Sequence, residues 1–227
     1  MLARMEYVEI ARAESVRGEL VLRERRDDNT RSVLELRANG IFVKDTVETT
    51  SERALAAAAL AVVVDPRDVL VGGVGLGFTM HEVLADVRVE SCTVVEIEPA
   101  LVDWMRDGTV GHGPKMLADA RLSLTVADIG DALAEAPAAS CDLVLLDVDN
   151  GPGYLVHEEN AALYRPEFLT RARAVLRPAG TLVIWAANRA PGLEDALRAV
   201  FGNAAETTYD VHMQGREVAY YLYSART

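Results

Sequence analysis

The stretch VLVGGVGLG, from Val69 to Gly77, decides the fold of this 227-residue chain. An apolar run ends directly in Gly73-x-Gly75-x-Gly77, and the residues after it have the pattern of a helix start. Glycine permits positive φ and lets a ligand approach the backbone closely, so a strand, a glycine turn and a helix in this order are typical of a nucleotide-binding sheet. The motif binds several nucleotide cofactors and also occurs as a tight turn without a ligand. The strands that follow it in the sequence are therefore needed to decide between these possibilities.

Three further apolar runs end in an acid, at Glu96, Asp128 and Asp147. A carboxylate about 20 residues after the glycines suits the two ribose hydroxyls of a nucleoside, which favours Glu96 for that contact. Asp128 is suited to accept from an adenine amino group. The carboxyl ends of parallel strands share the edge where open α/β sheets bind ligands. The alternative is that these acids only stabilise the helices that follow, whose N-termini carry a partial positive charge.

Strands and helices alternate from Asp68 onward, which predicts an α/β fold with a mostly parallel sheet covered by helices on both faces. Gln214-Gly215 separates two final strand patterns, so we expect the sheet to end in an antiparallel hairpin. The strands are expected over 69–71, 92–98, 122–126, 142–146, 181–185, 206–213 and 217–224, and the helices over 79–84, 99–107, 131–135, 166–176 and 192–200.

The first 50 residues lack the alternation of strands and helices seen in the rest of the chain. They predict a small antiparallel β-meander, with strands over 19–25, 31–37 and 41–45. Turns are expected at Asp27–Asn29 and at Asn39-Gly40, a pair that favours a tight hairpin. An Ala-rich helix follows, with Thr50 or Ser51 as its N-cap. We therefore divide the chain into a meander, 1–50, and a Rossmann-like domain, 51–227. A three-stranded element is marginal alone, so we expect the meander to pair in a homodimer.

Composition excludes several classes of protein. The chain has 35 acidic and 23 basic residues and a net charge of −12, which repels nucleic-acid phosphates. The longest uncharged apolar stretch, Ala54–Val64, is shorter than the about 20 residues that span a bilayer. The N-terminus lacks an apolar signal region, which favours the cytoplasm. Cys92 and Cys141 sit by apolar runs and are expected to be reduced core residues.

Taken together, the motifs resemble the spermidine synthase family of polyamine aminopropyltransferases, which has the seven-stranded fold of class I S-adenosylmethionine-dependent methyltransferases. The resemblance rests on the glycine turn, Val95–Pro99, Asp128, Leu146–Pro152 and Leu163–Phe168. It implies a cofactor of the S-adenosylmethionine type, decarboxylated or not. The residues that it assigns to cofactor binding are Gly73, Gly75, Gly77, Glu96, Ile97, Asp128, Ile129 and Asp147.

The chain departs from the family at the amine-binding positions. Leu76 stands in the glycine turn where the family usually has an Asp, and Ser51–Ala57 lacks the family's Tyr and His. Asn150 replaces the second Asp of the loop after Asp147. Because a polycation needs several carboxylates around it, we first favour a methyltransferase acting on a small molecule. The alternatives are an aminopropyltransferase using the decarboxylated cofactor and a non-catalytic nucleoside-binding relative.

The expected reaction brings a nucleophile in line with a sulfonium carbon and excludes water. Asp147 is the first candidate to hold an acceptor or take its proton, together with Asp149 and Tyr164 as catalytic residues. Asn150, Tyr154 and His157 follow on the stretch expected to cover the pocket and are candidates for acceptor binding. Three nearby oxygen ligands without a spaced His or Cys cluster do not make a metal site, so none is predicted.

Overall fold

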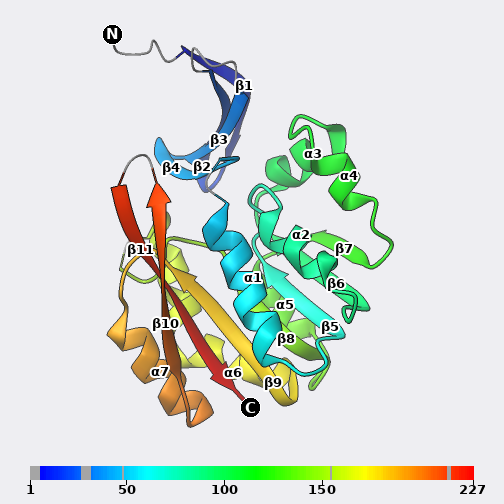
Figure 1. The fold of residues 1–227 in the computed structure, drawn as a ribbon, viewed down its shortest axis with the longest axis vertical. Coiled ribbons are helices and arrows are strands. Elements are labelled where there is room, and N and C mark those ends of the chain that lie inside the picture. The colour runs from blue at the N-terminus through cyan, green and yellow to red at the C-terminus, as the bar shows by residue number, and fades with distance from the viewer. Residues whose placement is uncertain (1–5, 27–31, 48, 154, 214–215) are drawn as a thin grey trace.

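The computed structural model describes residues 6–26, 32–47, 49–153, 155–213 and 216–227. It contains two sheets, a meander in the order β1-β2-β3-β4 and a main sheet in the order β10-β11-β9-β8-β5-β6-β7 (Figure 1). The meander consists of β1 (Glu6–Ser15), β2 (Gly18–Arg26), β3 (Ser32–Ala38) and β4 (Ile41–Asp45). The main-sheet strands are β5 (Asp68–Gly72), β6 (Ser91–Glu96), β7 (Leu122–Val126), β8 (Cys141–Leu146), β9 (Leu176–Ala186), β10 (Ala205–Met213) and β11 (Arg216–Arg226). The helices are α1 (Thr50–Val62), α2 (Phe78–Ala85), α3 (Pro99–Asp107), α4 (Gly113–Leu117), α5 (Ile129–Glu135), the 3₁₀ helix η1 (Glu158–Tyr164), α6 (Pro166–Val175) and α7 (Pro191–Phe201).

The main sheet confirms the predicted α/β fold. Strands β7, β6, β5, β8 and β9 pair in parallel, and β11 runs antiparallel between β9 and β10. Helices α1, α2 and α3 contribute to the apolar core on one face, and α5, α6 and α7 to the core on the other. Central strands are buried on both faces, since the adjacent residues Val144 and Leu145 of β8 belong to the two different cores and both are fully enclosed. This explains why their sequences are continuous apolar runs rather than alternating ones.

Two elements of the main sheet differ from the prediction. Strand β9 begins at Leu176 instead of Thr181, and Pro178 and Gly180 lie within it. Its pairing with β8 shifts register between Cys141 and Leu143, so the breaker residues are accommodated by an irregularity at the start of the strand. The short elements α4 and η1 were not expected, because neither is long enough to show a periodic pattern.

The meander has four strands instead of three. Strand β1 was missed because nearly all of it is exposed on the edge of the sheet, which leaves no buried face to impose alternation. The Asn39-Gly40 hairpin is confirmed, with positive φ of 51° and 75° at its two residues. The Asn39 side chain also fastens the neighbouring turn, because its Oδ1 accepts the Glu19 N–H at 2.9 Å. The turn expected at Asp27–Asn29 lies outside the described residues.

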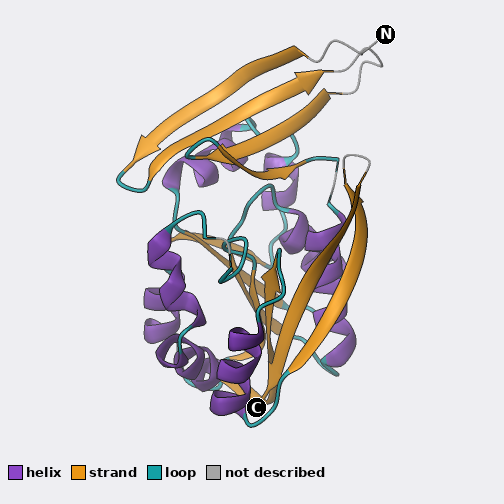
Figure 2. Ribbon diagram, turned by 90° about the vertical axis from the view of Figure 1, so that its left-hand side faces the viewer, coloured by secondary structure: helices purple, strands orange, loops and turns teal. Residues whose placement is uncertain are grey.

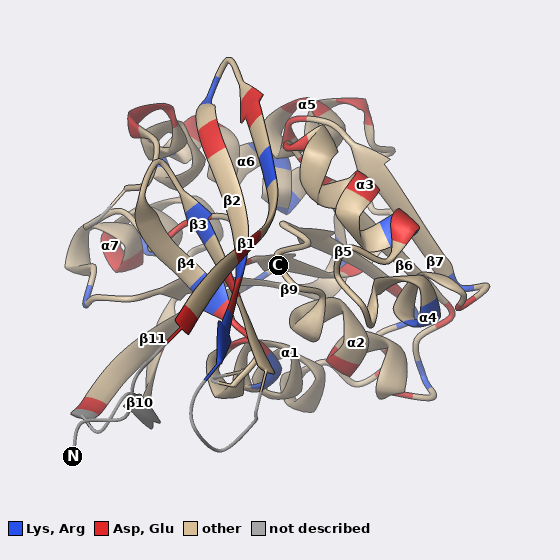
Figure 3. Cartoon of the chain, turned by 90° about the horizontal axis from the view of Figure 1, so that it is seen from above, with Lys and Arg blue, Asp and Glu red and all other residues tan. Residues whose placement is uncertain are grey.

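The meander lies across the carboxyl edge of the main sheet as a separate layer (Figures 2 and 3). It is joined to the rest of the chain by apolar packing, since Leu22 and Leu36 belong to the same buried cluster as Leu55 of α1. The N-cap of α1 is Thr49 rather than Thr50 or Ser51. The Ser51 hydroxyl donates to Glu52 Oε2 at 2.8 Å, so it does not serve the helix end.

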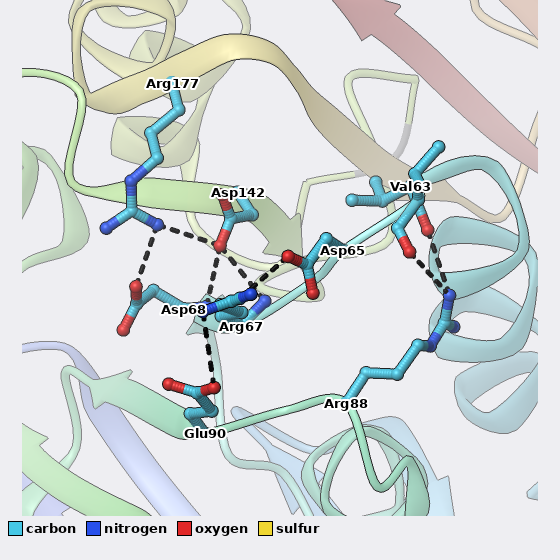
Figure 4. Close-up of polar contacts among 9 residues, drawn as sticks. Val63, Asp65, Arg67, Asp68, Arg88, Glu90, Asp142 and Arg177 are labelled. Atoms are coloured by element: carbon cyan, nitrogen blue, oxygen red, sulfur yellow. Dashed lines mark hydrogen bonds and ion pairs between the residues drawn. The ribbon is translucent and has the colours of Figure 1, made fainter.

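The amino edge of the main sheet carries a network of ion pairs (Figure 4). Arg177 donates to Asp142 and pairs with Asp68, each at 2.8 Å, and the backbone N–H of Arg67 donates to Asp142 at 3.0 Å. Each of these carboxylates has a partner and none lines the large cavity described below, so we interpret this cluster as structural. Among the described residues, no helix is long and apolar enough to cross a membrane.

Candidate active site

A cavity of about 390 Å³ lies between the meander and the carboxyl edge of the main sheet. One wall is formed by the ends of β5, β6 and β8 and the start of α5, and the other by β2, β3 and β4. The predicted site residues that line it are Gly73, Gly75, Glu96, Ile97, Asp128, Ile129, Asp147, Asp149, Asn150 and His157. The structure therefore gathers residues from four strand ends at one place, as the spacing predicted.

The glycine turn and the end of β6 are tied together by Glu96. Its carboxylate accepts the backbone N–H of Val74 and of Glu98, each at 2.9 Å, and only 7 % of the residue is exposed. Burial raises the pKa of Glu96, while these backbone hydrogen bonds oppose the rise. Each carboxylate oxygen has a second lone pair, so Glu96 can still accept from a ligand hydroxyl in the cavity.

Close backbone approach explains one glycine of the turn. Gly73 has φ of 88°, and a Cβ there would lie 2.3 Å from the backbone oxygen of Asp147. Gly77 also has positive φ, of 89°, but an added Cβ would meet Met116 and Met105, outside the cavity wall. Gly77 is therefore placed for packing against α3 and α4, and the role in cofactor binding expected for it lacks support from its position.

Asp128 begins α5 as its N-cap. Its Oδ1 accepts the backbone N–H of Gly130 at 2.6 Å and of Asp131 at 3.3 Å. Asp128 therefore does serve the N-terminus of the helix that follows it, as the alternative interpretation requires. Asp128 also lines the cavity, and its second oxygen leaves capacity for a ligand donor.

The Asp147 side chain is held by groups from two distant parts of the chain. Its Oδ2 lies 2.5 Å from Lys44 Nζ and accepts from the Thr79 hydroxyl at 2.9 Å. The Lys44 ammonium is also 3.8 Å from Glu52 Oε1. All these side chains are largely buried. Burial lowers the pKa of Lys44, but the nearby carboxylates of Asp147 and Glu52 outweigh it and raise that pKa overall. The lysine is therefore a permanent cation at the centre of the site.

The loop after β8 is braced by Asp149. Its Oδ1 accepts the backbone N–H of Asn150 and of Val156, at 2.6 and 2.8 Å, and its Oδ2 accepts from Asn160 Nδ2 at 2.7 Å. Arg17, from the β1–β2 turn, donates to Asn160 Oδ1 at 3.0 Å. The meander and the loop are thus linked over the cavity, and Asp149 holds the loop in place.

Two other candidates have different outcomes. Tyr164 is buried in the core and is not among the residues that line the cavity, and burial raises the pKa of its hydroxyl above the usual value. Its position therefore gives no support to a catalytic role. Tyr154 lies outside the described residues. His157 does line the cavity, and burial together with the Arg17 guanidinium lowers its pKa, so it is neutral near pH 7.

Sequence reasoning missed Lys44 and Glu52. Lys44 lies on a short strand of mixed pattern, and Glu52 was interpreted only as part of a helix start. The sequence offered one signal for Lys44, because lysine is rare in this chain: Lys44 is one of two lysines among 23 basic residues. Among the described residues, no group of His, Cys, Asp and Glu has the arrangement of a metal site.

Comparison with known proteins supports the resemblance. Over 124 residues the chain is 32 % identical to polyamine aminopropyltransferase 2 of Pseudomonas aeruginosa, covering 53 % of this chain and 33 % of that one. It is 30 % identical over 125 residues to putrescine N-methyltransferase 3 of Nicotiana tabacum, covering 54 % and 31 %. The chain thus spans less than half the length of the curated relatives that it matches.

Solved structures show the same fold. A spermidine synthase in complex with the transition-state analogue AdoDATO superposes with a TM-score of 0.79 at 18 % identity, over 96 % of this chain and 73 % of that one. The Thermotoga maritima spermidine synthase gives 0.77 at 17 %, over 96 % and 72 %. The family model of the spermine/spermidine synthase domain matches residues 48–202. This chain therefore belongs to the spermine/spermidine synthase domain family.

Proposed function

We propose that this chain transfers an aminopropyl group from decarboxylated S-adenosylmethionine to a small amine. The observation that carries the proposal is that Glu96, Asp128 and Asp147 line one cavity with the glycine turn. The relatives support it, because two that match 64 % and 56 % of the chain are polyamine aminopropyltransferases. They favour this alternative over the methyltransferase that the departures from the family first suggested.

The residues present fit such a cofactor. The cavity of about 390 Å³ is within the range of small-molecule sites, and buried carboxylates at two strand ends face it. In the proposal Glu96 accepts from the ribose, Asp128 accepts from the adenine, and Ile97 and Ile129 contact the ring faces. When bound, the cofactor supplies a carbon made electrophilic by its sulfonium.

The chain must then present the amine as a free base. Asp147 lies at the end of β8 beside the glycine turn, where it can orient an ammonium and accept its proton. Asn150 and His157 line the same cavity and are proposed to contact the rest of the acceptor. The meander covers this space and limits access of water, which favours the transfer over hydrolysis.

The direct test is incubation of the purified protein with decarboxylated S-adenosylmethionine and putrescine, followed by chromatography. Release of 5′-methylthioadenosine that is lost in Asp147→Asn would support the proposal. Absence of product with a panel of mono- and diamines would reject it and leave methyl transfer and a nucleoside-binding relative without turnover as the remaining candidates. Titration with 5′-methylthioadenosine alone tests the nucleoside site independently.

Methyl transfer is the second candidate, and Lys44 favours it. A Cβ on Gly75 would lie 3.3 Å from Lys44 Nζ, so the ammonium lies against the glycine turn, next to the buried Leu76. A cofactor tail ending in an ammonium would meet a like charge there, while a carboxylate would meet an opposite one. Titration calorimetry with the two cofactors separates the candidates: tighter binding of S-adenosylmethionine supports methyl transfer.

We also propose that the chain acts as a cytoplasmic homodimer. The free thiols of Cys92 and Cys141 are buried, which suits a reducing compartment. Strand β1 is an edge strand on which Val8 and Ile10 are exposed, as at a strand that pairs with a second copy. A monomer mass by light scattering at micromolar concentration would reject the dimer.

A further inference from the structure

The site contains an ammonium that belongs to the chain itself. Lys44 extends from β4 of the meander, and its Nζ lies 2.5 Å from Oδ2 of Asp147. The proposed function assigns this same carboxylate to the ammonium of the acceptor. In the structure as described, Lys44 therefore stands where an acceptor amine would bind.

The oxygen that Lys44 contacts has no further capacity. Asp147 Oδ2 also accepts from the Thr79 hydroxyl at 2.9 Å, and a carboxylate oxygen has two lone pairs. Thr79 is 2 % exposed and fixed on α2, so it cannot move away readily. An amine that binds this oxygen must displace the lysine.

Glu52 offers Lys44 a second partner. Its Oε1 is 3.8 Å from Lys44 Nζ, and its other oxygen accepts from the Ser51 hydroxyl at 2.8 Å. Glu52 is 5 % exposed and has no other basic partner among the described residues. A buried carboxylate without a close cation is costly, so a position nearer to Glu52 is available to the lysine.

We propose that Lys44 is a positioning residue that moves from Asp147 to Glu52 when the acceptor amine binds. This inference rests on the proposed transfer to an amine, and it adds the residue pair that sets how tightly that amine binds. The apparent affinity for the amine then depends on the difference between the two pairings of Lys44. Glu52 determines how readily the lysine leaves Asp147, although it does not touch the acceptor.

A double-mutant cycle tests this switch. The measured quantities are the Kd of putrescine in the presence of saturating 5′-methylthioadenosine, and KM and kcat for putrescine. We expect Glu52→Gln to raise Kd and KM about 10-fold or more with little change in kcat, because the displaced lysine loses its partner. Lys44→Met should lower Kd, and Glu52→Gln should then have no further effect in the Lys44→Met background.

The cycle separates the switch from simple charge effects. If Glu52 acted only as a negative charge that attracts amines, Glu52→Gln would weaken binding equally in both backgrounds, and this additive result would overturn the inference. Lys44→Arg, which keeps the charge and the fold, should retain the dependence on Glu52. Lys115→Met on α4 and Glu82→Gln on α2 are matched controls outside the cavity. Failure of every variant to bind or convert an amine would overturn the proposed function together with the switch.

Discussion

The carboxylate of Glu96 accepts the backbone N–H of Val74 at 2.9 Å, which joins the end of β6 to the glycine turn after β5. The two residues are 22 positions apart in the sequence. One side chain thereby lines the proposed nucleoside site and supports the glycine turn beside it. Loss of this contact should affect binding and stability together.

Glu96→Gln tests this dual role. Glutamine has one acceptor oxygen where the carboxylate serves both Val74 and Glu98, so one buried N–H loses its partner and faces an amide donor. We expect the free energy of unfolding to fall by about 1–3 kcal/mol, as measured by urea denaturation. The affinity for 5′-methylthioadenosine should fall at least about 10-fold. A variant that is destabilised but binds normally would show that Glu96 is only structural.

Gly73→Ala should be more damaging than Gly40→Ala. Both glycines have positive φ, but an added Cβ at Gly40 meets no atom within 4 Å, while at Gly73 it lies 2.3 Å from the Asp147 carbonyl oxygen. Gly40→Ala should cost only the conformational term of about 1–2 kcal/mol. Gly73→Ala adds overpacking and should cost about 2–5 kcal/mol. Equal losses of unfolding free energy would contradict the close approach at Gly73.

Glu52 should make stability depend on pH in a definite direction. Burial raises the pKa of Glu52 above its usual value, although the Lys44 ammonium opposes the rise. The folded state thus holds this proton up to a higher pH than the unfolded state does, and the stability that this contributes is present at low pH and lost as pH rises through the raised pKa. Glutamine stays neutral throughout. The unfolding free energy of wild type minus that of Glu52→Gln should therefore decrease from pH 4 to pH 8, and a difference that increases would refute the assignment.

The two cysteines should be unreactive in the folded protein. Burial raises the pKa of the Cys92 thiol to about 12, and it also raises that of Cys141. At pH 8 the reactive thiolate of Cys92 is then present at a fraction of about 10⁻⁴. A disulfide-exchange reagent should label neither thiol in native buffer. It should label both in about 6 M guanidinium, which unfolds most proteins. Rapid labelling of the native protein would show that either side chain is accessible.

The sequence predicted best those segments in which the residue types and the hydrophobic pattern indicate the same structure. Strand β5 and its glycine turn were visible because a buried parallel strand must be apolar and the turn must be small. Asp128 and Asp147 were found because they follow apolar runs directly. Strand β1 escaped because it is exposed on the edge of the meander, where nothing requires alternation.

Lys44 and Glu52, the site residues that the sequence analysis missed, were missed for one physical reason. Lys44 and Asp147 are 103 positions apart, and their contact depends on how the meander is placed over the main sheet. Local patterns carry no information on that placement. Tyr164 is the opposite case, since the motif around it suggested a role in the site while the fold buries its ring in the core. Residues whose role depends on strand ends were predictable, and residues whose role depends on the packing of two layers were not.

The position of Lys44 on β4 has a consequence for how such a protein can diversify. The matched family domain begins at residue 48, so this lysine and the meander's share of the cavity wall lie upstream of it. The proposed nucleoside site and the meander strands that cover the proposed acceptor site are thus encoded by separate stretches of the gene. In this proposal, changes or recombination within the upstream stretch can alter acceptor preference while the downstream domain stays intact.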